Sequence, residues 1–327
     1  MPERAELHTH LGSAVNPPIL WSLAHAQGIK LPSKNYWEFE DMITMRGSEY
    51  NTSLDEMHNN FFRWTELIQS SPLAVEESVK NVIGGGYRKC NLILQELRFN
   101  PMFRNRGGEQ DLDHIIMAAL RGMDKAILEY PQVRAGIILM MDRTLDFKQN
   151  QIILKKAIKY KNRGIIGIDV AGPQRESFSI EKHTPLFEEA RSAGLGITIH
   201  TGEEGDLDEL KYVVDVIKPD RIGHGILCVK DKEIMKTIKE NNITLEICIT
   251  SNLRNKKVKN VAEIKKIIKT LIKNEVKFTL NTDGPEMYQT NIYKEQIFAI
   301  EKNILTEEQI KQCTKNAFAA SFIKENN

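Results

Sequence analysis

Two histidines near the start of the chain, His8 and His10, are separated by one residue in the stretch ELHTHL. In a β-strand, residues i and i+2 point to the same face, so both imidazoles can hold one metal ion. A third histidine, His200, and an aspartate, Asp283, each follow an apolar run. Three imidazoles and one carboxylate suit zinc or a similar transition metal and leave room for a water molecule. The alternative is two core histidines and an aspartate that caps a turn.

The runs that precede these residues belong to a regular pattern. Eight short stretches are rich in Ile, Val and Leu, as expected of parallel strands buried on both faces. They are residues 5–11, 92–101, 133–141, 164–172, 195–203, 220–226, 243–251 and 276–283. Helical spacing of apolar residues lies between them, for example at 111–130 and 261–274. Strand–helix alternation repeated eight times predicts one (β/α)₈ TIM barrel domain over residues 1–327. A doubly wound sheet is the alternative, but no GxGxxG follows the first strand.

The first connection of this barrel is unusually long, from residue 12 to residue 89. It contains helix-like stretches around 17–28 and 55–70, and aromatic residues gather in YWEFEDMI and HNNFFRWTELI. We expect a helical insertion that covers the C-terminal mouth of the barrel as a lid or packs beside it. Ordinary helix packing explains the same pattern equally well.

The composition of the chain restricts the class of ligand that we expect it to bind and the cellular compartment in which we expect it. The 327 residues carry a net charge of only +1, so there is no basic field to attract nucleic acid. No apolar run reaches the roughly 18 residues that indicate a membrane span. The four cysteines form no CxxC pair and no charged-then-apolar leader begins the chain, which predicts a reducing, cytoplasmic location. A small, weakly charged molecule is the expected partner, and the oligomeric state stays undetermined.

Polar residues stand at the ends of most of the predicted strands, where barrel enzymes place their active-site groups. They are His8 and His10, Glu96 and Arg98, Asp169, His200 with Glu203, His224, Glu246, Ser251 with Asn252, and Asp283. Glu96 and Arg98 can pair inside the barrel in a structural role. The four remaining histidines are interpreted as surface or packing residues: His25, His58, His114 and His183.

Six motifs occur in a fixed order between residues 6 and 285: ELHTHL, GIDVAG, HTGEE, RIGHG, CITSN and NTDGP. Together they resemble the adenosine deaminase family of the amidohydrolase superfamily. The resemblance implies zinc-dependent hydrolysis of a 6-aminopurine nucleoside, adenosine or 2′-deoxyadenosine, to inosine or 2′-deoxyinosine and ammonia. It assigns one zinc ion per chain to His8, His10, His200 and Asp283. The fourth strand has no lysine of the kind that bridges two metals in other members of the superfamily.

The resemblance also assigns the proton chemistry. Glu203 matches the glutamate that protonates the purine ring nitrogen next to the amino-bearing carbon, and His224 matches the residue that orients the attacking water. His10 and Gly172 are placed against the substrate, the backbone N–H of Gly172 facing purine N3. Carboxylates often orient metal-bound histidines, which is the role that the resemblance gives to Asp169 and Glu246.

Two glycines depart from the family pattern, at positions that we place beside the substrate. Gly12 stands where the family has an aspartate that binds the ribose 5′-hydroxyl. Gly284 replaces a second aspartate, which contacts purine N7, and the nearby Glu286 is a candidate substitute. We therefore expect open space beside the 5′ position. The alternatives are a 5′-substituted nucleoside such as 6-amino-6-deoxyfutalosine or 5′-methylthioadenosine, free adenine, or a barrel that binds purines without catalysis.

Overall fold

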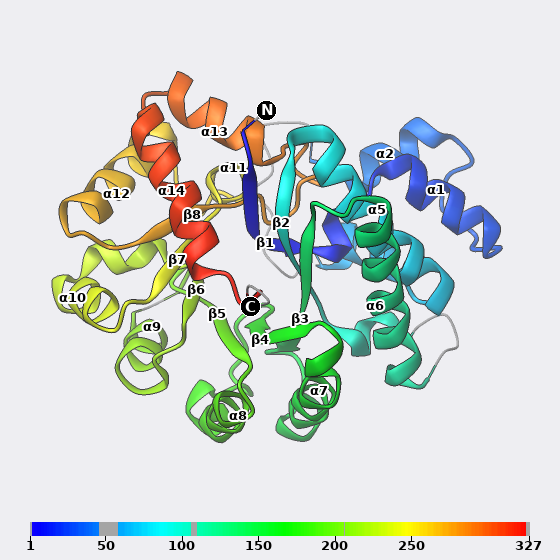
Figure 1. Cartoon of the computed structure of the whole chain (residues 1–327), viewed down its shortest axis with the longest axis horizontal. Helices are drawn as coiled ribbons and strands as arrows, with labels where there is room; N and C mark the ends of the chain where they lie inside the picture. The colour runs from blue at the N-terminus through cyan, green and yellow to red at the C-terminus, as the bar shows by residue number, and fades with distance from the viewer. Residues whose placement is uncertain (1, 46–57, 106–109, 206, 325–327) are drawn as a thin grey trace.

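In the computed structural model, eight parallel strands form one barrel in which each strand pairs with the next (Figure 1). The structure describes residues 2–45, 58–105, 110–205 and 207–324. The strands are β1 (Arg4–His10), β2 (Leu92–Phe99), β3 (Arg134–Asp142), β4 (Ile165–Ala171), β5 (Gly196–Thr201), β6 (Arg221–His224), β7 (Thr244–Ile247) and β8 (Phe278–Leu280). All eight predicted runs form strands, so the predicted (β/α)₈ TIM barrel is confirmed.

The barrel closes between its last and first strands at residues of the predicted metal site. The His10 N–H donates to the Asp283 carbonyl at 2.8 Å, and the Asp283 N–H donates to the His8 carbonyl at 2.9 Å. The Glu6 carboxylate accepts the backbone N–H of His8 at 3.0 Å and that of Thr282 at 3.0 Å. These hydrogen bonds join His8 directly to Asp283, so two segments that are 275 residues apart in the sequence lie side by side.

Helices surround the sheet, and most of them begin at a residue whose side chain caps them. They are α1 (Pro17–Ala26), α2 (Tyr36–Ile43), α4 (Arg63–Ile68), α5 (Pro72–Cys90), α6 (Leu112–Glu129), α7 (Phe147–Tyr160), α8 (Ile180–Ser192), α9 (Asp208–Tyr212), α10 (Lys232–Glu240), α11 (Ile249–Arg254), α12 (Val261–Lys273), α13 (Ile292–Glu301) and α14 (Glu307–Ala320). The side chain of Asp111 accepts a backbone N–H at the start of α6, and Asn260 does the same for α12. Among the described residues, no helix is long and apolar enough to cross a membrane.

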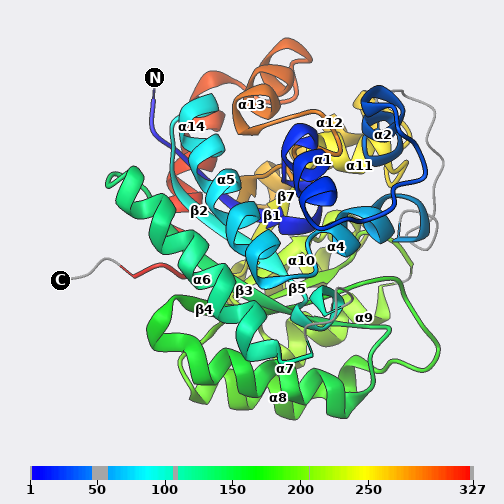
Figure 2. The ribbon, with the colours of Figure 1, turned by 90° about the vertical axis from the view of Figure 1, so that its right-hand side faces the viewer.

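The long first connection forms the helices α1, α2, α4 and α5, with a turn of π-helix, η2 (His58–Phe62), before α4. Residues 55–57 of the predicted helical stretch 55–70 lie outside the described residues. Figure 2 shows α1, α2 and α4 on the opposite side of the barrel from the C-terminus. Phe62 and Glu66 from this connection line the pocket of the site described below. Its function as a lid stays a prediction.

Candidate active site

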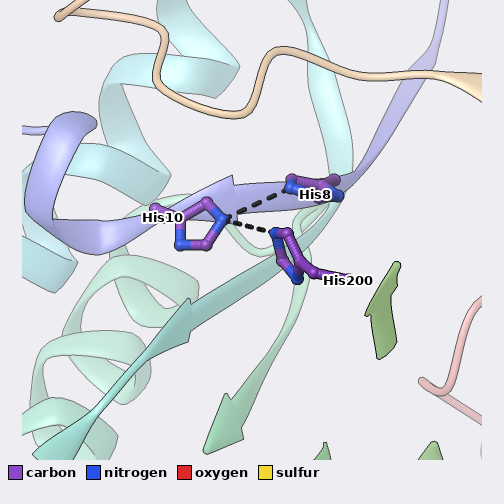
Figure 3. Close-up of side chains that lie close together, drawn as sticks. All are labelled: His8, His10 and His200. Atoms are coloured by element: carbon purple, nitrogen blue, oxygen red, sulfur yellow. Dashed lines mark hydrogen bonds between the residues drawn. The ribbon is translucent and has the colours of Figure 1, made fainter. Parts of the chain in front are cut away.

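Three imidazole rings from two strands converge at the carboxyl end of the barrel (Figure 3). His8 and His10 come from β1 and His200 comes from β5. The Nε2 atom of His10 lies 3.3 Å from that of His8 and 3.1 Å from that of His200. The i, i+2 spacing on β1 therefore brings both rings to the same face, as predicted.

Asp283 completes this group from the loop after β8. One carboxylate oxygen lies 3.3 Å from His10 Nε2 and 3.7 Å from His8 Nε2, while the other accepts the Ser251 hydroxyl at 2.6 Å. Two ligands of one tetrahedral zinc ion, each about 2.1 Å away, lie about 3.4 Å apart. The distances of 3.1–3.7 Å from His10 and His8 to their neighbours in this group are compatible with a single ion of this kind.

The imidazoles are oriented by buried carboxylates behind them. Glu246 Oε2 lies 2.7 Å from His8 Nδ1, and Asp169 Oδ2 lies 3.0 Å from His200 Nδ1. Each carboxylate accepts an Nδ1–H, which leaves the Nε2 lone pair free to face the ion position. Burial, followed by the charge of Arg98, lowers the pKa of His8 and of His200 well below the ordinary value. These rings are therefore neutral, as metal ligation requires.

Arg98 holds the two carboxylates in place. Its guanidinium lies 2.9 Å from Asp169 Oδ2 and 2.8 Å from Glu246 Oε2, and all three side chains are buried. Burial opposes ionisation of Glu246, but Arg98 and Arg221 outweigh it and lower the pKa of this carboxyl. Arg98 thus has a structural role, although its partners differ from the Glu96 that we considered.

Glu203 and His224 stand beside the ligands at the ends of β5 and β6. Glu203 lines the pocket, and burial raises its pKa to about 7. The Asn252 side-chain amide donates to His224 Nδ1 at 3.1 Å, so Nε2 carries the proton, and it lies 3.8 Å from Glu203 Oε1. A carboxyl group that is protonated near neutral pH is suited to general acid catalysis.

His224 and Asp283 share a strained backbone. Their φ angles are +61° and +63°, in the left-handed region that residues other than glycine adopt at a cost of roughly 1 kcal/mol or more. His224 ends β6, and Asp283 lies three residues beyond the end of β8. The left-handed turn bends the chain away from the barrel just after each side chain has been presented to the pocket.

The glycines predicted to contact substrate have different surroundings. Gly172 lines the pocket with φ +91°, and a Cβ there would lie 2.6 Å from the Asp142 carboxylate. A Cβ at Gly12 would lie 3.1 Å from Arg104 Nη2 and 3.4 Å from Phe62. The expectation of open space beside Gly12 is therefore wrong, because the side chains of Arg104 and Phe62 occupy this space.

Gly284 and its neighbour Glu286 lie outside the set of described residues that line the pocket. A Cβ at Gly284 would lie 2.7 Å from the Ser13 hydroxyl, so an aspartate does not fit there without rearrangement. The Glu286 carboxylate binds the Lys89 ammonium instead. The structure therefore places Glu286 away from the pocket.

Sequence reasoning missed several polar residues of this pocket. Arg143 directly follows β3, and its guanidinium donates to the His200 carbonyl and to Glu209. Its place at a strand end is a signal that could have found it. Arg104 lies on a short 3₁₀ helix, η3 (Pro101–Arg104), and is 2% exposed. No spacing in the sequence indicates that it approaches Gly12.

The family model for adenosine deaminase matches residues 3–327. The chain belongs to the adenosine deaminase family. It is 30% identical to the adenosine deaminase of Clostridium kluyveri over 322 residues, 98% of this chain and 89% of the relative. The structure of Arabidopsis ADAL complexed with IMP has a TM-score of 0.82 at 21% identity and covers 98% and 92% of the two chains. A Burkholderia ambifaria amidohydrolase with bound Zn has a TM-score of 0.86 at 18% identity, covering 99% and 86%. The chain is therefore an aminohydrolase that acts on C–N bonds.

Proposed function

We propose that this member of the adenosine deaminase family removes the 6-amino group of adenosine or 2′-deoxyadenosine and depends on one zinc ion. The observation that carries the proposal is the convergence of His8, His10, His200 and Asp283 beside a buried Glu203. The grouping of His8, His10 and His200 and the carboxylate partners of His8 and His200 support one ion at this place. The Zn in the Burkholderia structure of the same fold supports the choice of metal.

The reaction requires a nucleophile, a proton for the ring and an exit for ammonia. His8, His10, His200 and Asp283 would hold a divalent ion, which would supply a nucleophile from water near neutral pH. Glu203, protonated up to a pH of about 7, delivers a proton to the ring nitrogen next to the amino-bearing carbon. His224 donates from Nε2 and so orients the incoming oxygen. Gly172 lines the pocket, at the position where the family resemblance puts a backbone N–H against purine N3.

The end of the pocket beside Gly12 favours a second candidate. Arg104 places a buried guanidinium where the family has an aspartate, and Glu66 lies 3.9 Å from it and also lines the pocket. The carboxylate of Glu66 can accept a 5′-hydroxyl, whereas the guanidinium of Arg104 can bind an anionic 5′ substituent bidentately. An adenine nucleoside with an anionic 5′ group is therefore the alternative substrate.

A substrate panel tests both candidates. Ammonia release is measured for adenosine, 2′-deoxyadenosine, adenine, 5′-methylthioadenosine, S-adenosylhomocysteine, aminodeoxyfutalosine and AMP, together with zinc content by elemental analysis. The proposal predicts about one zinc per chain and the highest kcat/KM for adenosine or 2′-deoxyadenosine. A higher kcat/KM for AMP or aminodeoxyfutalosine would support the second candidate. Two metal ions at full occupancy, or turnover of none of these compounds by zinc-loaded protein, would contradict the proposal.

A further inference from the structure

The C-terminal segment enters the barrel at the end opposite to the active site. Figure 1 shows the chain passing from α14 to the centre of the barrel, and Figure 2 shows the C-terminus far from α1, α2 and α4. The ring of Phe322 lies against the place where Gly167 of β4 pairs with Gly196 of β5. A Cβ at Gly196 would lie 2.3 Å from this ring, and one at Gly167 would lie 2.9 Å from it. The two glycines thus leave the space that the ring fills.

Polar contacts tie the same segment to two buried charged residues. The Ser321 hydroxyl and the Phe322 N–H each donate to Glu96 Oε1 at 2.7 Å. Arg221 donates to the Ala320 carbonyl at 2.7 Å, and its guanidinium carbon lies 3.6 Å from the centre of the Phe322 ring, a cation–π contact. Both Glu96 and Arg221 have no exposed surface.

These two residues continue the chain of contacts towards the predicted metal ligands. Arg221 Nη2 donates to Glu96 Oε2 at 2.5 Å, and Arg221 Nε donates to Glu246 Oε1 at 2.6 Å. The other oxygen of Glu246 lies 2.7 Å from His8 Nδ1. Hydrogen bonds between buried charges are strong, and removing one partner leaves an uncompensated charge at the next. Three buried side chains therefore connect the C-terminal segment with His8.

We propose that residues 320–322 are a positioning element of the metal site. They hold Glu96 and Arg221, which fix the Glu246 carboxylate, which in turn sets the orientation of the His8 imidazole. This inference rests on the metal site proposed above. A segment that only plugged the barrel would contribute to stability and leave the metal affinity of the folded protein unchanged.

Zinc affinity of the folded protein separates these two roles. The dissociation constant is measured by competition with a chromophoric chelator for the wild type, Ser321→Ala and Phe322→Ala. Ile323→Ala is the matched control, because Ile323 belongs to the same segment but packs against apolar residues of β1 and β2. Loss of groups that orient a ligand typically weakens metal binding by 10-fold to 100-fold, so we expect an increase of about tenfold for Ser321→Ala and Phe322→Ala. With zinc saturating, KM for adenosine should not change.

The outcomes also separate this inference from the proposed function. Wild-type affinity in both Ser321→Ala and Phe322→Ala, or an equal loss in Ile323→Ala, would overturn the positioning role while the metal site stands. If Phe322→Ala does not fold, Ser321→Ala decides, because it removes one hydroxyl and retains the packing of the ring. A wild type that binds no zinc at all would refute the proposed function itself.

Discussion

At the residue scale, the site separates a proton donor from the groups that hold the ion. Glu203 lies outside the set of four proposed ligand groups, and burial raises its pKa to about 7. Asn252 bridges the two candidate catalytic residues, since its amide nitrogen lies 3.1 Å from His224 Nδ1 and 3.4 Å from Glu203 Oε1. The two candidate catalytic residues are therefore positioned as one unit.

Replacement of Glu203 tests its role as donor. Glu203→Gln retains the shape of the side chain but cannot release a proton, so kcat should fall by at least about 10²-fold while zinc content stays at the wild-type level. Glu188→Gln is the matched control, because Glu188 is an exposed residue of α8 outside the pocket lining, and it should retain most of the activity. Near-normal turnover by zinc-loaded Glu203→Gln would show that the proton comes from another group.

The pH dependence of the reaction follows from the same carboxyl. Its pKa is raised to about 7, chiefly by burial, so the acid is protonated below this pH and ionised above it. Catalysis that needs the protonated form should therefore lose activity as the pH rises through about 7. The profile of kcat against pH between about 5.5 and 9 measures this limb. A rate that stays constant across pH 7 to 9 is incompatible with Glu203 as the acid.

The contact between Arg104 and Gly12 leads to a prediction about which 5′ groups the pocket accepts. Gly12→Asp places a carboxylate beside the Arg104 guanidinium, where the two charges pair and no longer attract an anionic 5′ group. The ratio of kcat/KM for adenosine to that for AMP should rise by about tenfold to a hundredfold, and Arg104→Met should shift it in the same direction. An unchanged ratio in both folded, zinc-loaded variants would mean that this end of the pocket does not face the 5′ position.

The convergence of His8, His10 and His200 could be predicted from the sequence and the position of Arg104 could not, for a physical reason. His8 and His10 are two apart on a strand, so their common face follows from strand geometry alone. Arg104 and Gly12 are brought together by the packing of the short helix η3 at the pocket. No periodic pattern of residues in the sequence indicates this packing. Glu286 is close to Asp283 in the sequence, but its side chain binds Lys89 and does not reach the site. Nearness in the sequence alone therefore does not identify a residue of the pocket.

At the scale of elements, the short strands depend on side chains to complete the barrel. β8 has three residues, and beyond its end the chain is joined to β1 by the backbone hydrogen bonds of Asp283 and by the Glu6 carboxylate, which accepts the N–H of Thr282. All eight strands could be predicted because each is a separate apolar run. The position of Phe322 could not be predicted, because its ring packs against Gly167 and Gly196, two glycines that are far from it in the sequence. In the sequence these glycines only interrupt the apolar runs of β4 and β5.

The fit of Phe322 between these strands predicts a coupling between substitutions. The three heavy atoms nearest to a Cβ at Gly196 all belong to the Phe322 ring. Gly196→Ala should therefore lower the free energy of unfolding by about 1–3 kcal/mol in the wild type, and by much less in the Phe322→Ala background. Chemical denaturation of the two single variants and the double variant measures the coupling. Equal costs in both backgrounds would show that the ring does not occupy this space in solution.

At the scale of the whole molecule, the metal site joins the first strand, the fifth strand and the loop after the eighth. The ligands His8, His200 and Asp283 come from parts of the chain that meet only when the barrel closes. The unfolded chain therefore lacks the site, and an ion that binds only the folded state stabilises it. The proposed site would thus couple metal binding to barrel closure through the same residues.

Removal of the metal should consequently lower the stability of the whole barrel. At a free zinc concentration about 100 times the dissociation constant, the stabilisation is about 2.7 kcal/mol, which corresponds to a rise of a few degrees in Tm. Thermal unfolding of chelator-treated protein, before and after zinc is restored, measures it. His200→Ala should lose this response, whereas His25→Ala should retain it, because His25 is an exposed residue of α1. A Tm that does not respond to zinc in the wild type, or that rises equally in His200→Ala, would mean that the ion binds elsewhere or does not distinguish the folded chain from the unfolded one.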